Sequence, residues 1–116
     1  MGRVLNAKTA NSQLVGGIVW GVGMALTEHT LVDPQSGRVL NANLAQYHVP
    51  VNADIGAVDV TFVDENDERF ASTGARGIGE IGITGVPAAI ANAIHHATGK
   101  RFRDLPITPD LLILHA

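Results

Sequence analysis

One acidic residue, Glu80, lies in a glycine-rich stretch over residues 72–82 with the sequence Ser-Thr-Gly-Ala-Arg-Gly-Ile-Gly-Glu-Ile-Gly. Glycine permits backbone conformations and close approaches that a Cβ atom would prevent. An apolar segment of helical character follows at once. A carboxylate held by such a backbone is suited to general acid–base catalysis or to contact with a ligand. Glu80 is therefore the candidate catalytic residue, and a tight turn without chemistry is the alternative.

The same stretch also matches a nucleotide-binding pattern. Residues 77–82 read Gly-x-Gly-x-x-Gly, as at the phosphate-binding turn of dinucleotide-binding folds. That turn should follow its strand immediately, whereas the preceding predicted strand ends near Val63. The acidic residue expected about 20 residues later is also missing, since Asp104 lies in a proline-flanked connection. The spacing therefore argues against nucleotide binding.

Composition excludes several other classes of function. The 116 residues are enough for one domain, and 8 basic against 11 acidic residues give a net charge of −3, which offers no case for nucleic acid binding. The absence of Cys excludes disulfides and iron–sulfur clusters held by this chain alone. The five His residues have no ligand spacing, so we predict no protein ligand to a metal. The composition suits a cytoplasmic protein, and a periplasmic location stays open because a targeting signal could lie on another segment.

A glycine-rich helix is predicted before the middle of the chain. The apolar run over residues 14–26 is shorter than the roughly 20 residues that span a bilayer, so no membrane insertion is predicted. Asn11 and Ser12 offer N-cap oxygens. Each glycine in the run costs about 1 kcal/mol of helix propensity, which predicts close packing against another backbone or a ligand. Gln13 could donate to a ligand at the helix N-terminus, although a simple first-turn polar residue is the alternative.

The remaining elements are predicted to be short. The turn sequence Asp-Pro-Gln-Ser-Gly at residues 33–37 should join two hairpin arms at residues 31–33 and 38–40. Alternating apolar residues predict a strand at 55–63.

A second helix is marked by its ends. Thr84 is the predicted cap, Pro87 lies in the first turn and Gly99 ends the helix. A final short turn or helix runs through Leu114. The predicted fold class is α+β, with two packed Gly/Ala-rich helices, a short β-hairpin and a further strand.

Two segments resemble molybdenum hydroxylases. One is residues 11–26, Asn-Ser-Gln-Leu-Val-Gly-Gly-Ile-Val-Trp-Gly-Val-Gly-Met-Ala-Leu; the other is residues 74–82, followed by the Ala-rich helix and Gly99-Lys100-Arg101. In this order they resemble the C-terminal part of the large, molybdopterin-binding subunit of the xanthine dehydrogenase and aldehyde oxidase family. The resemblance covers essentially the whole chain and implies that its fold is part of the molybdopterin-binding domain.

The resemblance also implies roles for individual residues. Glu80 matches a glutamate that acts as general base towards a molybdenum-bound hydroxyl. Gln13 matches a glutamine that contacts the pterin cofactor. The backbone of Gly77, Ile78 and Gly79 lies where the family brings main chain close to the cofactor. Molybdenum is held by the pterin dithiolene, which is consistent with the absence of protein ligands.

The family's subunits are several times longer than this chain. We therefore expect residues 1–116 to form a single domain or fragment of a subunit that oxidises aldehydes or N-heterocycles. Its expected partners are the rest of the molybdenum-binding subunit and, by family, iron–sulfur and flavin subunits or domains. Alone, the chain is expected to bind no molybdopterin and to lack hydroxylase activity. The alternative is a non-catalytic α+β interaction module or orphan fragment.

Overall fold

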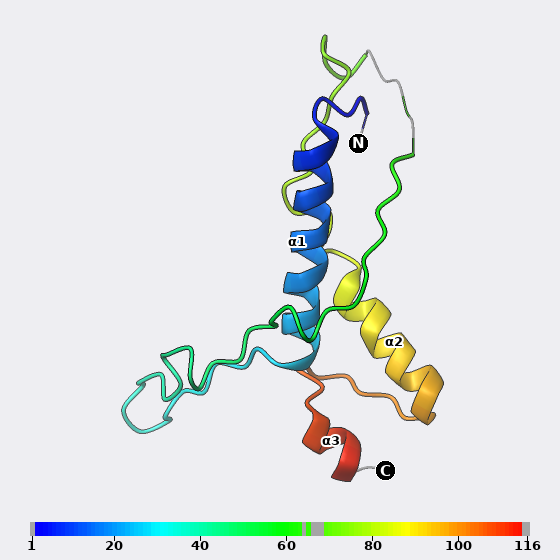
Figure 1. The fold of residues 1–116 in the computed structure, drawn as a ribbon. Helices are drawn as coiled ribbons and strands as arrows, with labels where there is room; N and C mark the ends of the chain where they lie inside the picture. Colours follow the sequence, from blue (N-terminus) through cyan, green and yellow to red (C-terminus); the bar gives the residue numbers. More distant parts are fainter. Residues whose placement is uncertain (1, 64, 66–68, 115–116) are drawn as a thin grey trace.

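The computed structural model of the chain describes residues 2–63, 65 and 69–114. These ranges contain three helices, α1 (Ala7–Leu26), α2 (Val86–Thr98) and α3 (Pro109–Leu114). In Figure 1, α1 is the long central element, α2 lies beside its C-terminal half, and residues around 30–50 form an arm away from both. The radius of gyration is 17.9 Å, against about 13 Å for a compact domain of 100 residues. The structure is therefore open and elongated.

The strand content of the predicted α+β fold is wrong for the described residues, which are mainly helical and contain no β-strand. The hairpin arms meet in a single bridge between Val32 and Val39, where the Leu40 N–H donates to the Leu31 carbonyl at 2.7 Å. Within residues 55–63, positions 57–63 alternate between exposed and half-buried, but the segment forms no ladder. A strand needs a partner for its backbone N–H and C=O groups. The described part of the chain supplies none, so the alternating pattern stays unpaired.

Helix α1 begins earlier than the expected cap at Asn11 or Ser12. Asn6 is the N-cap, with an extended backbone and a side-chain oxygen that accepts a hydrogen bond from the Thr9 N–H at 3.1 Å. The residues between Asn6 and Asn11 can extend the helix because they carry no Gly or Pro. No described helix is long and apolar enough to cross a membrane.

The predicted C-terminal end of α2 is confirmed, whereas its predicted N-cap is not. Pro87 lies in the first turn, and Gly99 ends the helix with a left-handed φ of 72° while its N–H donates to the His95 carbonyl at 2.8 Å. The predicted Thr84 cap is wrong, because Gly85 is the N-cap and makes no side-chain bond. The Thr84 hydroxyl instead donates to the Glu80 carbonyl at 3.4 Å.

The predicted close packing of α1 is confirmed at its glycines. A Cβ atom on Gly17 would lie 2.9 Å from the Cα atom of Gly82, in the turn before α2. A Cβ on Gly21 would lie 2.5 Å from the Cβ of Val86 in α2. Both distances are below any normal contact, so only glycine lets α1 come this close to α2 and the turn before it.

The C-terminal end of α1 is tied to two connecting segments. Ile107 is fully buried, and its N–H donates to the Ala25 carbonyl at 2.7 Å, which anchors the approach to α3. The Tyr47 hydroxyl donates to the Glu28 carboxylate at 3.0 Å, which anchors the arm. This hydrogen bond raises the pKa of Tyr47, because loss of the hydroxyl proton would place two negative charges together.

Gly17→Ala and Gly16→Ala should have opposite effects on stability. A Cβ on Gly17 meets the backbone of Gly82, so alanine there must displace the turn and should cost about 1–3 kcal/mol. A Cβ on Gly16 meets no atom within 4 Å, so alanine there should gain up to about 1 kcal/mol of helix propensity. Urea unfolding followed by circular dichroism measures both. Equal effects would contradict the proposed close contact.

Tyr47 should titrate above the usual tyrosine value of about 10. As it is the single tyrosine, absorbance of the tyrosinate reports it alone. Because the folded-state pKa is raised, the stability that this contact adds is complete below about pH 10 and is lost as pH rises through the folded pKa. Glu28→Ala should lower the titration midpoint of Tyr47 towards the usual tyrosine pKa. An unchanged midpoint would show that Glu28 does not contact Tyr47 in solution.

Candidate functional site

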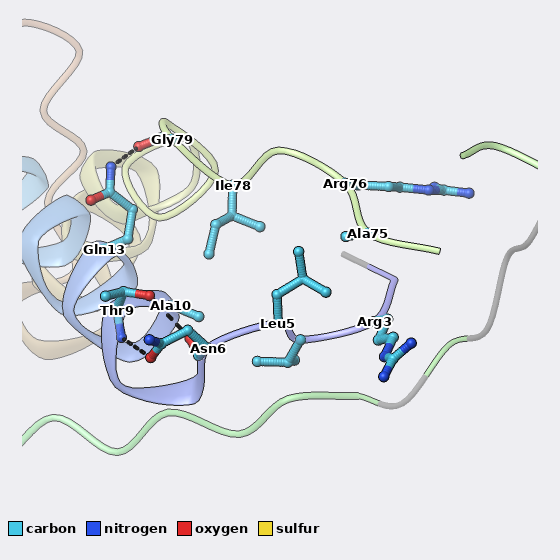
Figure 2. A pocket seen from close by; sticks show the side chains of 11 residues that line it. Arg3, Leu5, Asn6, Thr9, Ala10, Gln13, Ala75, Arg76, Ile78 and Gly79 are labelled. Carbon is cyan, nitrogen blue, oxygen red and sulfur yellow. Dashed lines mark hydrogen bonds between the residues drawn. The ribbon is translucent and has the colours of Figure 1, made fainter. Parts of the chain in front are cut away.

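A cavity of about 380 Å³ lies where the start of α1 meets the glycine-rich stretch. Its walls come from the residues before α1, from the first turns of α1 and from residues 75–79 (Figure 2). Gly2 pairs with Ala75 in a bridge, and the Arg3 N–H donates to the Gly74 carbonyl at 2.8 Å. Gly2 and Gly74 have positive φ angles of 69° and 67°, which favour glycine. These contacts hold the segment before α1 against the start of the glycine-rich stretch. The lining residues are Arg3, Val4, Leu5, Asn6, Thr9, Ala10, Gln13, Ala75, Arg76, Ile78 and Gly79.

Gln13 connects the helix to the glycine-rich stretch. Its Nε2 amide donates to the Gly79 carbonyl at 2.9 Å, as Figure 2 shows, although the two residues are 66 positions apart. A glutamine amide carries a second N–H and an acceptor oxygen. Gln13 can therefore hold the Gly79 backbone and still offer hydrogen-bonding groups to a ligand in the cavity.

The structure brings together part of the predicted set of site residues. Gln13, Ile78 and Gly79 line the cavity, whereas Gly77 and Glu80 are exposed neighbours that do not line it. Glu80 opens the turn that leads to α2, and its carbonyl accepts from the Ile83 N–H at 3.3 Å. Glu80 thus lies on a short turn, next in sequence to Gly79 of the cavity wall.

At two positions of the stretch, no contact among the described residues requires a glycine. A Cβ on Gly77 or on Gly79 would meet no atom within 4 Å, and neither residue has a positive φ. Neither packing nor backbone conformation within the described residues therefore requires glycine at these positions. Their absent side chains leave main chain open to approach from outside.

The sequence analysis missed two cationic residues of the site. Arg3 and Arg76 both line the cavity, from segments that are far apart in the sequence. The Arg76 guanidinium carbon lies 4.9 Å from the centre of the Phe70 ring, an orientation favoured by the cation–π attraction. The cavity lining therefore includes two residues that are positively charged at neutral pH. Arg76 was visible inside the glycine-rich stretch, but only the fold places Arg3 beside it.

Among the described residues, no group of three or more His, Asp or Glu residues could hold a metal ion.

Comparisons with known proteins converge on one family. Residues 1–56 match the family described as a molybdopterin cofactor-binding domain. The chain is 49% identical over 112 residues to the aldehyde oxidoreductase molybdenum-binding subunit PaoC of Escherichia coli K12, covering 97% of this chain and 15% of that subunit. It is 40% identical over 111 residues to the putative xanthine dehydrogenase molybdenum-binding subunit XdhA of the same organism, covering 96% and 15%.

The fold is also found inside a much larger solved chain. Quinoline 2-oxidoreductase from Pseudomonas putida 86 superimposes with a TM-score of 0.87 at 23% identity, over 97% of this chain and 14% of that one. At this identity the likeness concerns the fold alone. The chain spans about 15% of the length of the curated relatives it matches.

Removal of the Gln13 amide should loosen the glycine-rich stretch. Gln13→Ala deletes the bond to the Gly79 carbonyl, which at an exposed site is worth about 0.5–1.5 kcal/mol. Amide hydrogen exchange around Gly79 should accelerate roughly two- to tenfold. Gln46→Ala is the matched control, because its side-chain oxygen accepts a hydrogen bond from nearby Asn43 in the arm. Unchanged exchange around Gly79 would count against the contact.

Proposed function

We propose, since the chain is a segment of the molybdopterin-binding subunit of the xanthine dehydrogenase and aldehyde oxidoreductase family, that it completes the active site of such a molybdenum hydroxylase. The observation that carries the proposal is the hydrogen bond from Gln13 to Gly79. It joins the two family-like segments at the wall of one cavity. The substrate class is an aldehyde or an N-heterocycle.

The residues around the cavity fit a pterin cofactor. A pterin ring presents several hydrogen-bond donors and acceptors, which the Gln13 amide can match. The open backbone at Gly77 and Gly79 leaves space for a planar group to approach the main chain. Arg3, which also lines the cavity, carries a positive charge that suits an anionic substituent. Molybdenum would be held by the cofactor.

The bound cofactor would supply the redox chemistry of the hydroxylation. The residues of this chain have separate tasks. Gln13 and the backbone of Gly77, Ile78 and Gly79 bind and orient the cofactor. The Glu80 carboxylate accepts a proton as general base, and the bond from Gln13 to its neighbour Gly79 holds the turn that presents it. The remaining cofactor-binding groups come from the rest of the subunit.

This division of tasks explains why the isolated chain should be inactive. A general base contributes to the rate only beside the group that it deprotonates. The chain matches 15% of the length of its relatives, so most of a complete cofactor pocket lies outside it. The alternative is a fragment that folds or associates without redox chemistry. The two proposals differ in whether the completed assembly retains molybdenum.

The proposed base is tested in a reconstituted subunit. The chain is co-expressed with the E. coli aldehyde oxidoreductase whose molybdenum-binding subunit lacks the 112 residues aligned to this chain. Glu80→Gln should lower aldehyde turnover about 10²- to 10⁴-fold, because proton transfer is lost, while molybdenum content stays at the wild-type level. Asp59→Asn, an exposed carboxylate outside the site, is the matched control.

Each result of this experiment has a distinct meaning. Equal turnover of the wild type and Glu80→Gln would remove Glu80 from the mechanism. An assembly that contains this chain but no molybdenum would favour the non-catalytic alternative. Molybdenum content and turnover are measured on the same purified samples, so loss of metal is not mistaken for loss of the base.

A further inference from the structure

One face of α1 carries large apolar side chains that the described structure covers only in part. Gly16, Trp20 and Met24 recur at helical spacing and so lie on one side of α1; we call them the exposed stripe. Trp20 is 55% exposed and Met24 is 43% exposed. Gln13 lies on the same side, one turn before Gly16, where the helix borders the cavity. The stripe is therefore continuous with the candidate site.

The exposed stripe is a consequence of how α1 packs. Gly17 and Gly21, which contact Gly82 and Val86, lie roughly a quarter-turn around the helix from the exposed stripe. The structure thus packs the glycine side of α1 closely and leaves the neighbouring side, with Trp20 and Met24, only partly covered. A covered tryptophan removes about 150–250 Å² of surface from water, so an open one forgoes a large stabilisation.

Gly16 indicates what the open face is shaped to contact. A glycine inside a helix costs about 1 kcal/mol relative to alanine. At Gly17 that cost is offset by the close approach of the Gly82 backbone, but a Cβ on Gly16 would meet no atom within 4 Å. The same physical reason would apply to Gly16 if another polypeptide backbone approached the exposed stripe.

We propose that the exposed stripe docks against an apolar segment in the rest of a molybdopterin-binding subunit, which brings its backbone close to Gly16 and covers Trp20 and Met24. This inference rests on the proposed function. Its occupant follows from the comparisons, because the same fold, at a TM-score of 0.87, forms 14% of a larger solved chain. The chain's own core is also small: the fully or nearly fully buried apolar residues among those described are Ala10, Ala25 and Ile107.

Trp20 allows a direct test because it is the single tryptophan. The full chain is labelled with 5-fluorotryptophan and mixed with unlabelled E. coli molybdenum-binding subunit that lacks the aligned 112 residues. In the complex, the fluorine resonance should shift and should lose its dependence on H₂O against D₂O. A complex in which the fluorine keeps the full solvent dependence of the free chain would overturn the docking proposal and leave the proposed function standing.

Variants test the close approach at Gly16. Gly16→Leu should keep or raise the helicity of the free chain, because leucine favours helix and meets open space. It should weaken the complex at least tenfold, since the added side chain separates the two backbones. Leu44→Asp is the control, because Leu44 is 80% exposed in the arm and lies outside the stripe. Equal affinity of wild type and Gly16→Leu would contradict the close approach.

Two further outcomes would also overturn the docking proposal. If the free chain self-associates in sedimentation experiments and thereby protects Trp20, the occupant is a second copy and the proposal is overturned. As a positive control, the aligned 112 residues of the E. coli subunit are supplied as a separate chain. If that segment forms the complex and this chain does not, both the docking proposal and the proposed function fail.

Discussion

The contact between two glycines, Gly17 in α1 and Gly82 in the turn before α2, is the constraint on which the arrangement depends. A Cβ on either residue would lie within about 3 Å of the other segment's backbone. This approach brings the glycine-rich stretch alongside α1, so that Gln13 can reach the Gly79 carbonyl. The cavity wall and the position of Glu80 follow from the same approach. A side chain as small as a methyl group at this point would change all of them.

The molecule is unusual in how little of its apolar surface it buries. Helix α1 approaches Val86 of α2 and the turn before it at glycines, which allow close approach but bring little apolar area out of water. Trp20 and Phe70 remain largely exposed, and residues 55–63 have no partner strand within the described ranges. The exposed stripe and this unpaired segment have one physical explanation. In both cases the described residues supply too little covering surface or no partner strand.

The predictions succeeded where the decisive interactions are local. Gly99 ends α2 because a left-handed residue is needed there, and Pro87 is tolerated where no N–H is required. The turn at residues 33–37 formed for the same kind of reason, with the Gln35 N–H bonded to the Asp33 carboxylate and a positive φ at Gly37. The strand at 55–63 failed because a strand is stabilised by a distant partner. The start of α1 was also misplaced, since Asn6, Asn11 and Ser12 are all acceptable caps and local sequence does not choose among them.

The sequence by itself determined the chemistry that this chain can offer. A single acidic residue among glycines and a polar residue just before a glycine-rich apolar run are properties of residue type and spacing. Only the tertiary structure decided which of these groups meet. It placed Gln13 on the Gly79 carbonyl, brought Arg3 and Arg76 to one cavity, and left Glu80 on a turn at its edge. The reason is that such contacts join residues far apart in the chain, and the close packing of backbones at glycine sets their distances.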